Sequence, residues 1–232
     1  MADLLPNRSA TARLLAAAAL ATQVAACSND PTRIDYGLIT QGVAAQLGVT
    51  LPFGRSTAAA TQGIADPAVI LAQTNAPVTL AQPDSGAAPF YMVGVRDNGP
   101  WRTYATGSRQ TLVLRQGLVT ATRGLGRDLM ASEVDETLAL LRSGKPGKAK
   151  RVMQVLDGED RTRAIALDCT LTVGGQTRTA TGMTGRVMTE DCAAGDLRFR
   201  NSYVVNAAGT VIQSHQWLPT LVGPLTMQAL RP

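Results

Sequence analysis

Side chains that could carry out hydrolysis are scattered along this chain of 232 residues. Its single histidine, His215, follows Ser214, and a serine hydrolase needs a serine within hydrogen-bond reach of a histidine base. Both residues lie in a strand pattern, where adjacent side chains point to opposite faces. The sequence also lacks the Gly-x-Ser-x-Gly elbow that presents a nucleophilic serine. We therefore expect His215 to be a surface or half-buried strand residue.

Acidic side chains occur in two groups that could supply the paired carboxylates of a glycosidase. One group is Asp157, Glu159 and Asp160, and the other is Glu190 and Asp191. Both groups stand beside glycine or cysteine in turn-like surroundings, so we expect solvated surface acids. A glycosidase cleft is lined with aromatic residues, which make up only 4% of this chain. We predict no catalytic residues.

Four aromatic residues could instead form a platform on which sugars stack: Tyr91, Trp101, Tyr104 and Trp217. Packing in the core is the ordinary role of such residues in a small β domain. Trp101 and Tyr104 are three positions apart in a strand pattern, so they face opposite sides and we expect one of them to be exposed. With one histidine and three cysteines, a structural zinc site is not expected. We predict no metal and no cofactor.

The sequence pattern around these residues predicts that most of them lie in short strands. From residue 90 onward, β-branched and aromatic segments alternate with turn residues. The expected strands are Phe90–Val95, Trp101–Thr106, Gln110–Leu114, Leu118–Thr122, Arg151–Leu156, Arg163–Val173, Thr177–Thr189, Leu197–Asn206 and Thr210–Leu218. Their regular spacing predicts a mainly β fold, an antiparallel curled sheet that forms a barrel or sandwich with one inserted helix.

The inserted helix is indicated by Val134, Leu138 and Leu141, which share one helical face. Ser132 followed by Asp135 resembles a capping box that would start it. A glycine and a proline follow the pattern and are expected to stop the helix.

Glycines mark the expected turns. Gln116–Gly117 between apolar runs indicates a tight hairpin in which glycine supplies the positive φ. Gly174–Gly175 also reads as a two-residue turn, which would place Ala180 opposite Cys169.

The N-terminus reads as an export signal. Two arginines precede the apolar run Leu14–Ala21, and small residues follow, which is the order of a secretory signal peptide. The sequence VAAC at Val24–Cys27 resembles the lipobox of bacterial lipoproteins, in which the cysteine receives diacylglycerol and the signal is cut before it. A buried helix or a mitochondrial-type leader would leave the cysteine unexplained. The resemblance implies a signal peptide at residues 1–26 and lipid on Cys27, and Ser28 resembles the pattern sorted to the outer membrane.

With Cys27 lipidated, Cys169 and Cys192 are left as a pair in an oxidising compartment, and we expect a disulfide between them. A turn at the glycine pair would not bring them together directly. The bridge then requires a bend at Gly182 or Gly185, or another neighbouring strand.

The mature chain divides into two parts. Residues 27–88 are rich in Ala, Thr, Gln, Gly and Pro and are expected to form a tether with little regular structure, apart from a short amphipathic helix at Tyr36–Leu51 and a short strand or turn at Ala68–Gln73. Residues 89–232 are expected to form the β-rich periplasmic domain.

Trp101–Met130 is similar to the central segment of the YjbF-type lipoproteins, which are related to the GfcB-type lipoproteins of group 4 capsule systems. Gly117–Gly126, GLVTATRGLG, carries the glycine turn, the threonine-rich strand and the "TxGL" element of that family. Phe199–Val205 and Ile212–Trp217 are also similar, so the likeness covers about residues 85–230. It implies an outer-membrane lipoprotein on the periplasmic face, encoded with machinery for polysaccharide production or export.

Composition excludes several other classes. No apolar run reaches the roughly 18 residues of a membrane-spanning helix. The net charge of +5 comes from scattered basic residues, so no nucleic-acid partner is predicted. We expect a non-enzymatic accessory lipoprotein whose partners are the membrane, through its lipid, and other polysaccharide-export proteins or an acidic glycan. The alternatives are a periplasmic carrier of lipid or another hydrophobic ligand, and a glycan hydrolase.

Overall fold

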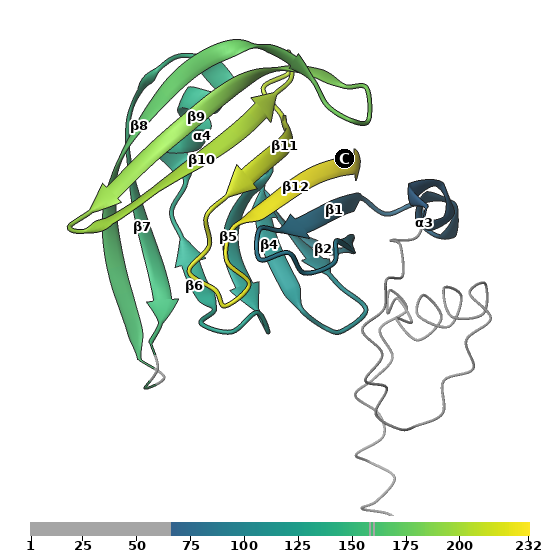
Figure 1. Cartoon of the computed structure of the whole chain (residues 1–232), viewed down its shortest axis with the longest axis horizontal. Helices are drawn as coiled ribbons and strands as arrows, with labels where there is room; N and C mark the ends of the chain where they lie inside the picture. Colours follow the sequence, from purple (N-terminus) through teal and green to yellow (C-terminus); the bar gives the residue numbers. More distant parts are fainter. Residues whose placement is uncertain (1–65, 158, 160) are drawn as a thin grey trace, which may run out of the picture. The chain divides into compact units, whose positions relative to one another are not determined.

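The computed structural model describes residues 66–157, 159 and 161–232 (Figure 1). In this part of the chain, one sheet of twelve antiparallel strands is accompanied by two helices. The predicted mainly β fold, a curled antiparallel sheet with an inserted helix, is confirmed. The signal peptide expected at 1–26, the lipid attachment expected at Cys27 and the helix expected at Tyr36–Leu51 lie outside the described residues.

The strands follow one another around the sheet. They are β1 (Val78–Pro83), β2 (Phe90–Asn98), β3 (Trp101–Ala105), β4 (Thr111–Arg115), β5 (Leu118–Arg123), β6 (Leu129–Ser132), β7 (Gly147–Leu156), β8 (Thr162–Arg178), β9 (Thr184–Ala194), β10 (Leu197–Val205), β11 (Val211–Gln216) and β12 (Leu225–Arg231). The helices are α3 (Pro67–Gln73) and α4 (Asp135–Ser143). The spatial order β5-β4-β3-β2-β1-β12-β11-β10-β9-β8-β7-β6 keeps sequence neighbours together, and β12 returns to pair with β1. The result is a nearly closed, barrel-like sheet with a seam between β5 and β6.

Side chains bridge this seam in place of a strand ladder. The Leu129 N–H donates to Thr122 Oγ1 at 3.0 Å, and Arg123 Nη1 donates to the Leu129 carbonyl at 3.2 Å. Backbone groups at the seam thereby gain partners that a continuous sheet would otherwise supply.

The side chain of Gln216, at the end of β11, hydrogen-bonds to backbone groups at the start of β5 and so links the two strands. Its Oε1 accepts the Val119 N–H at 3.0 Å, and its Nε2 donates to the Gly117 carbonyl at 2.7 Å. Strand β5 therefore lies against β11 as well as β4. We call β1–β5, β11 and β12 the terminal half, and β6–β10 with α4 the central half, whose strands β7–β10 form the curved wall in Figure 1.

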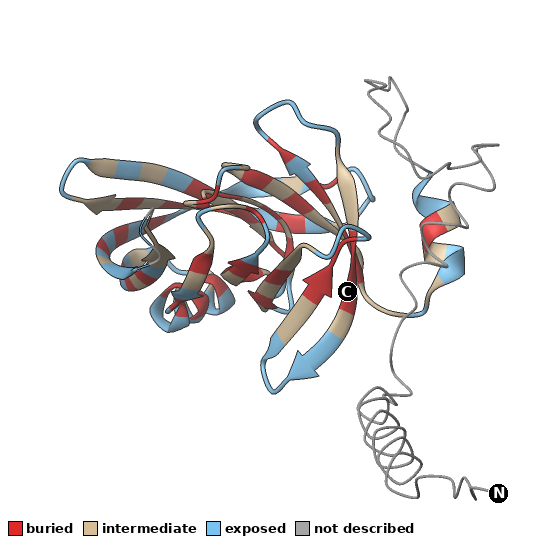
Figure 2. Ribbon diagram, turned by 90° about the horizontal axis from the view of Figure 1, so that it is seen from below, coloured by how far each residue is buried: buried red, intermediate tan, exposed pale blue. Residues whose placement is uncertain are grey.

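One face of the central strands is buried and the other meets solvent. Buried residues alternate with exposed ones along the middle of β8 and with mostly intermediate ones along β9, and Figure 2 shows such changes of colour along the ribbons of the sheet. This alternation is typical of an antiparallel sheet with one face on a core.

The predicted helix is present as α4, with Val134, Leu138 and Leu141 buried. It ends at Gly144, whose φ of 62° is left-handed, as expected for a glycine stop. The predicted capping box is wrong: the N-cap residue is Val134 without a side-chain cap, and Ser132 belongs to β6, where it is buried.

The sheet begins inside the segment expected to be a tether. Strand β1 pairs with β2 on one side and with β12 on the other, so the β-rich part starts before residue 89. Its six residues, VTLAQP, show little alternation of apolar and polar side chains. The strand is held by its pairing with β2 and β12, which lie far apart in the chain.

The expected strand or turn at Ala68–Gln73 is wrong, because this segment forms α3. Asp66 caps the helix by accepting a backbone N–H at 2.8 Å, and Pro67 occupies its first turn. Arg231, in β12, donates to the Leu71 carbonyl at 2.9 Å and so fastens the helix to the sheet.

The predicted tight hairpin is confirmed, since Gln116 and Gly117 have φ values of 52° and 92°. The turn expected at Gly174–Gly175 is wrong. These glycines lie within β8 at a shift in register, and the chain reverses at Thr179–Met183, where Gly182 has positive φ.

The longer β8–β9 hairpin places Cys169 directly opposite Cys192, with their Cα atoms 4.1 Å apart. Their sulfur atoms form a disulfide, and both residues are buried. No bend of the second strand is needed to bring them together.

Replacing both bridge residues, as in Cys169→Ala with Cys192→Ala, should lower the free energy of unfolding by about 3 kcal/mol, because the bridge closes a loop between residues 23 apart. Urea denaturation followed by circular dichroism measures the change. Reductant should lower the midpoint of the wild type and leave that of the double variant unchanged. Equal midpoints of the two proteins without reductant would contradict the prediction.

Candidate functional site

The histidine does not form a serine–histidine pair with its neighbour. His215 Nε2 lies 2.8 Å from Asp84 Oδ2 at the surface, whereas Ser214 is buried and accepts a hydrogen bond from Gln216 Nε2 at 2.9 Å. The predicted opposite orientation of Ser214 and His215 is therefore confirmed. Ser202 stands opposite His215 on the next strand, but no hydrogen bond joins the two in the described structure.

Several acidic residues are ordinary surface groups. Asp157 accepts two backbone N–H groups of its own loop, which lowers the pKa of its carboxyl, and Glu159 is exposed. Asp160 lies outside the described residues. Asp191 pairs with Arg200 at 2.7 Å on the outer face of the sheet.

Glu190 is not a solvated acid at a turn, contrary to expectation. It lies within β9, and its side chain is fully buried. Arg151 Nη1 donates to Oε2 at 2.9 Å and Thr137 Oγ1 donates to Oε1 at 2.6 Å. Asn201 Nδ2 and the Tyr203 hydroxyl also donate to Oε2, each at 2.8 Å. We call these five residues the Glu190 cluster.

The protonation state of each ionisable group in this cluster depends on its neighbours. Burial by itself would raise the pKa of Glu190, but Arg151 and the hydrogen bonds of its neighbours outweigh burial and lower it. Burial, together with the charge of Glu190, raises the pKa of Tyr203 well above its ordinary value. At neutral pH the cluster therefore holds an ionised Glu190, a charged Arg151 and a neutral Tyr203.

The Glu190 cluster adjoins the disulfide without forming a metal centre. One carboxylate oxygen of Glu190 and the sulfurs of Cys169 and Cys192 lie within 4.8 Å of one another. The sulfurs are bonded to each other, so they cannot act as thiolate ligands. We assign the cluster to the stability of the core.

The four aromatic residues do not form one platform. Trp101 and Tyr104 border the same pocket, and Trp101 is 40% exposed while Tyr104 is buried, so the expectation that one is exposed is confirmed. Trp217 instead stacks on Phe199 at a centroid distance of 4.5 Å. Tyr91 lines neither this pocket nor that of Trp217.

Trp217 borders a pocket of about 420 Å³, which we call the Trp217 pocket. Its lining residues are Arg127, Val155, Leu156, Asp157, Arg163, Ile165, Trp217 and Pro219. Two arginines and one acidic side chain give it a slight excess of positive charge.

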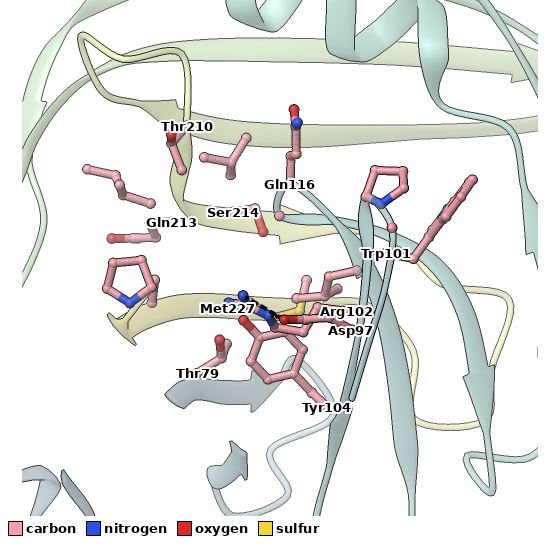
Figure 3. Close-up of a pocket in the computed structure, with 18 residues that line it drawn as sticks. Thr79, Asp97, Trp101, Arg102, Tyr104, Gln116, Thr210, Gln213, Ser214 and Met227 are labelled. Carbon is pink, nitrogen blue, oxygen red and sulfur yellow. Dashed lines mark hydrogen bonds and ion pairs between the residues drawn. The ribbon is translucent and has the colours of Figure 1, made fainter. Parts of the chain in front are cut away.

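The second aromatic pocket, which we call the mouth pocket, has a volume of about 310 Å³ and is lined by strand and turn residues of the terminal half (Figure 3). Its lining residues are Thr79, Asp97, Gly99, Pro100, Trp101, Arg102, Tyr104, Leu114, Gln116, Gly117, Thr210, Val211, Ile212, Gln213, Ser214, Met227, Ala229 and Pro232. In Figure 3, Gln116 and Thr210 border one side, whereas the pair Arg102–Asp97 lies with Met227 on the other. Small-molecule sites of proteins often occupy such mouths of curled sheets and combine apolar walls with a few polar groups.

One ion pair lies in the wall of the mouth pocket, and a second, outside its lining, holds the Trp101 ring. Arg102 donates from Nε to Asp97 Oδ1 at 2.6 Å and from Nη2 to Oδ2 at 3.3 Å, which lowers the pKa of Asp97 and raises that of Arg102. The Arg115 guanidinium lies 5.2 Å from the centre of the Trp101 ring and is held by Asp135 at 2.5 Å. The pocket therefore carries fixed donors, acceptors and an oriented indole. Sequence patterns alone do not reveal that these groups meet.

Comparisons with known proteins agree with this architecture. Residues 59–230 match the model of a family described as group 4 capsule polysaccharide lipoprotein GfcB, YjbF. The crystal structure of the hypothetical lipoprotein YmcC from Escherichia coli K12 has a similar fold, with a TM-score of 0.60 and 19% identity over 69% of this chain and 86% of that chain. No curated protein matches the chain. None of the helices in the described residues has the length and apolar character needed to cross a membrane.

Glu190→Gln should lower the free energy of unfolding by about 3–5 kcal/mol, because it leaves Arg151 buried without a counter-charge. Asp191→Asn is the matched control. It removes an adjacent, exposed ion pair and should cost about 1 kcal/mol or less. Urea denaturation at pH 7 measures both values, and similar losses in the two variants would refute the assigned role.

The ion pair also predicts a dependence of stability on pH. Because the pKa of Glu190 is lower in the folded protein than its ordinary value of 4.5, its contribution is complete above that value. The contribution is lost as the pH falls through the lower, folded pKa. Between pH 6 and roughly pH 3 the wild type should therefore lose more stability than Glu190→Gln. Parallel urea midpoints across this range would argue against it.

Proposed function

Because the chain belongs to the group 4 capsule polysaccharide lipoprotein family, we propose that it is a lipid-anchored accessory protein that supports production or export of an extracellular polysaccharide. Residues 1–26 are removed as a signal peptide, and Cys27 carries the lipid. The β-rich domain faces the periplasm at the outer membrane. The protein acts by binding and catalyses no reaction.

The mouth pocket is the observation that supports a binding role. It is open and formed by side chains that the fold already holds in place, including the ion pair Arg102–Asp97 and the stacked Trp101. Asp97 is the only acidic side chain among its lining residues and is engaged by Arg102. A glycosidase would need a second carboxylate facing the first across the cleft.

A carrier of acyl chains is supported less well. Such a carrier needs a dry, apolar cavity, and an apolar chain could not replace the water around an ion pair. The mouth pocket is open to solvent and holds a guanidinium and a carboxylate in its wall. We therefore keep the accessory role as the proposed function.

A lipid anchor gives weak binding a physical advantage. Two or more acyl chains hold a protein firmly at a membrane, whereas one chain binds only marginally. A domain tethered beside an export machine meets its ligand or partner at a high effective concentration, so tight affinity is not required.

A strain that lacks the gene should release less extracellular polysaccharide, and the wild-type gene should restore the amount.

Cys27→Ser should yield a protein that keeps its leader or is released from the membrane fraction, because the thiol is the site of lipid attachment. Polysaccharide in the culture medium, membrane fractionation and the mass of the intact protein provide the measurements. Unchanged polysaccharide in the deletion strain would overturn the proposed role, and an unchanged mass and location of Cys27→Ser would overturn the anchor.

A further inference from the structure

We propose that the mouth pocket binds a sugar ring of the exported polysaccharide, with Trp101 as the surface on which the ring stacks. This inference rests on the proposed function and names the ligand of its pocket. Trp101 and Leu221 are the two large apolar residues that are exposed in the described structure, and of these Trp101 lines a pocket.

Trp101 is exposed and yet held in position. The Arg115 guanidinium stacks on its ring, and Asp135, the first residue of α4, fixes that guanidinium. A side chain whose orientation is already fixed loses little freedom when a ligand binds. Core packing does not account for this arrangement, because 40% of the Trp101 surface stays in contact with solvent.

The mouth pocket has an indole at its edge and an ion pair in its wall, and a pyranose ring offers a chemical partner to each. One face of the ring presents C–H groups that pack on an aromatic surface, while its hydroxyl groups need donors and acceptors. Arg102 and Asp97 are joined side by side in a two-point contact, so neighbouring hydroxyls can accept from the guanidinium and donate to the carboxylate. Gln116 and Gln213 add amide groups to the pocket wall.

The charges in the pocket indicate how the ligand is selected. The charge of Arg102 is balanced by Asp97, so the pocket wall has no net charge with which to select an acidic sugar. Selection therefore depends on the shape of the ring and the order of its hydroxyls. A volume of about 310 Å³ is at the small end of small-molecule sites, so a short piece of the polymer enters and the remainder stays outside.

Calorimetric titration of the purified full chain tests this assignment. The probe is a set of short oligosaccharides released by partial hydrolysis from the extracellular polysaccharide of the strain that encodes the protein. The wild type should bind them, Trp101→Ala should weaken binding at least about tenfold, and Trp101→Phe should recover part of the affinity because it retains an aromatic ring. Circular dichroism confirms that each variant is folded.

Two controls locate the site. Leu221→Ala shortens the other exposed apolar side chain, which lies outside the mouth pocket, and should leave the affinity unchanged. Arg163→Ala alters the Trp217 pocket and should also leave it unchanged. Loss of binding in Arg163→Ala together with full binding in Trp101→Ala would overturn the assignment in favour of the Trp217 pocket.

Other outcomes separate this inference from the proposed function. No binding by the folded wild type, or equal binding by Trp101→Ala, overturns the sugar site. Binding of palmitate that Trp101→Ala abolishes would overturn it in favour of an acyl ligand. In the deletion strain, full restoration of polysaccharide by Trp101→Ala overturns the sugar site and leaves the accessory role intact. Unchanged polysaccharide after deletion overturns the accessory role even where the oligosaccharides bind.

Discussion

The buried ion pair between Arg151 and Glu190 is the constraint on which the central half of the structure depends. Neither charge reaches solvent, and a buried charge that loses its partner costs several times more than a broken surface ion pair. Arg151 on β7 and Glu190 on β9 must therefore point to the same side of the intervening β8, where β10 and α4 supply further hydrogen bonds. A shift of β9 by one residue would turn Glu190 to the outer face, so the ion pair selects one register for these strands and one position for the helix.

Hydrogen bonds extend from this pair into the terminal half. The Asn201 side chain donates to Glu190, and its Oδ1 accepts the backbone N–H of Trp217 at 2.8 Å. The preceding residue, Gln216, reaches across to the turn at Gly117, which lines the mouth pocket. A side chain at Gly117 would collide with β11, since a Cβ there would lie 2.7 Å from its nearest side-chain atom. The close contact between β5 and β11, and with it the shape of the pocket, therefore depends on polar groups fixed in the core.

Polar side chains thus serve two purposes in this protein. In the Glu190 cluster they are enclosed and bonded to other protein groups, so they specify the fold and have no contact with a ligand. In the mouth pocket, Arg102 and Asp97 remain partly exposed and can exchange water for the hydroxyl groups of a ligand. This division is the basis of the binding role proposed for the mouth pocket. It also agrees with a family named for capsule polysaccharide.

Local patterns in the sequence predict several local features correctly, although they misplace the capping box at Ser132 and the turn at Gly174–Gly175. The turn at Gln116–Gly117, the buried helix face around Leu138 and the opposite orientations of Trp101 and Tyr104 each depend on residues a few positions apart. The same patterns misplace Glu190 as a solvated acid, because two of its partners, Arg151 and Thr137, lie 39 and 53 positions away. They also miss β1, whose pairing partner β12 lies at the other end of the described chain. The sequence by itself determined periodicity, turns and family resemblance. Only the tertiary structure decided which polar residues are buried and which meet in a pocket, because burial depends on how distant segments pack against each other.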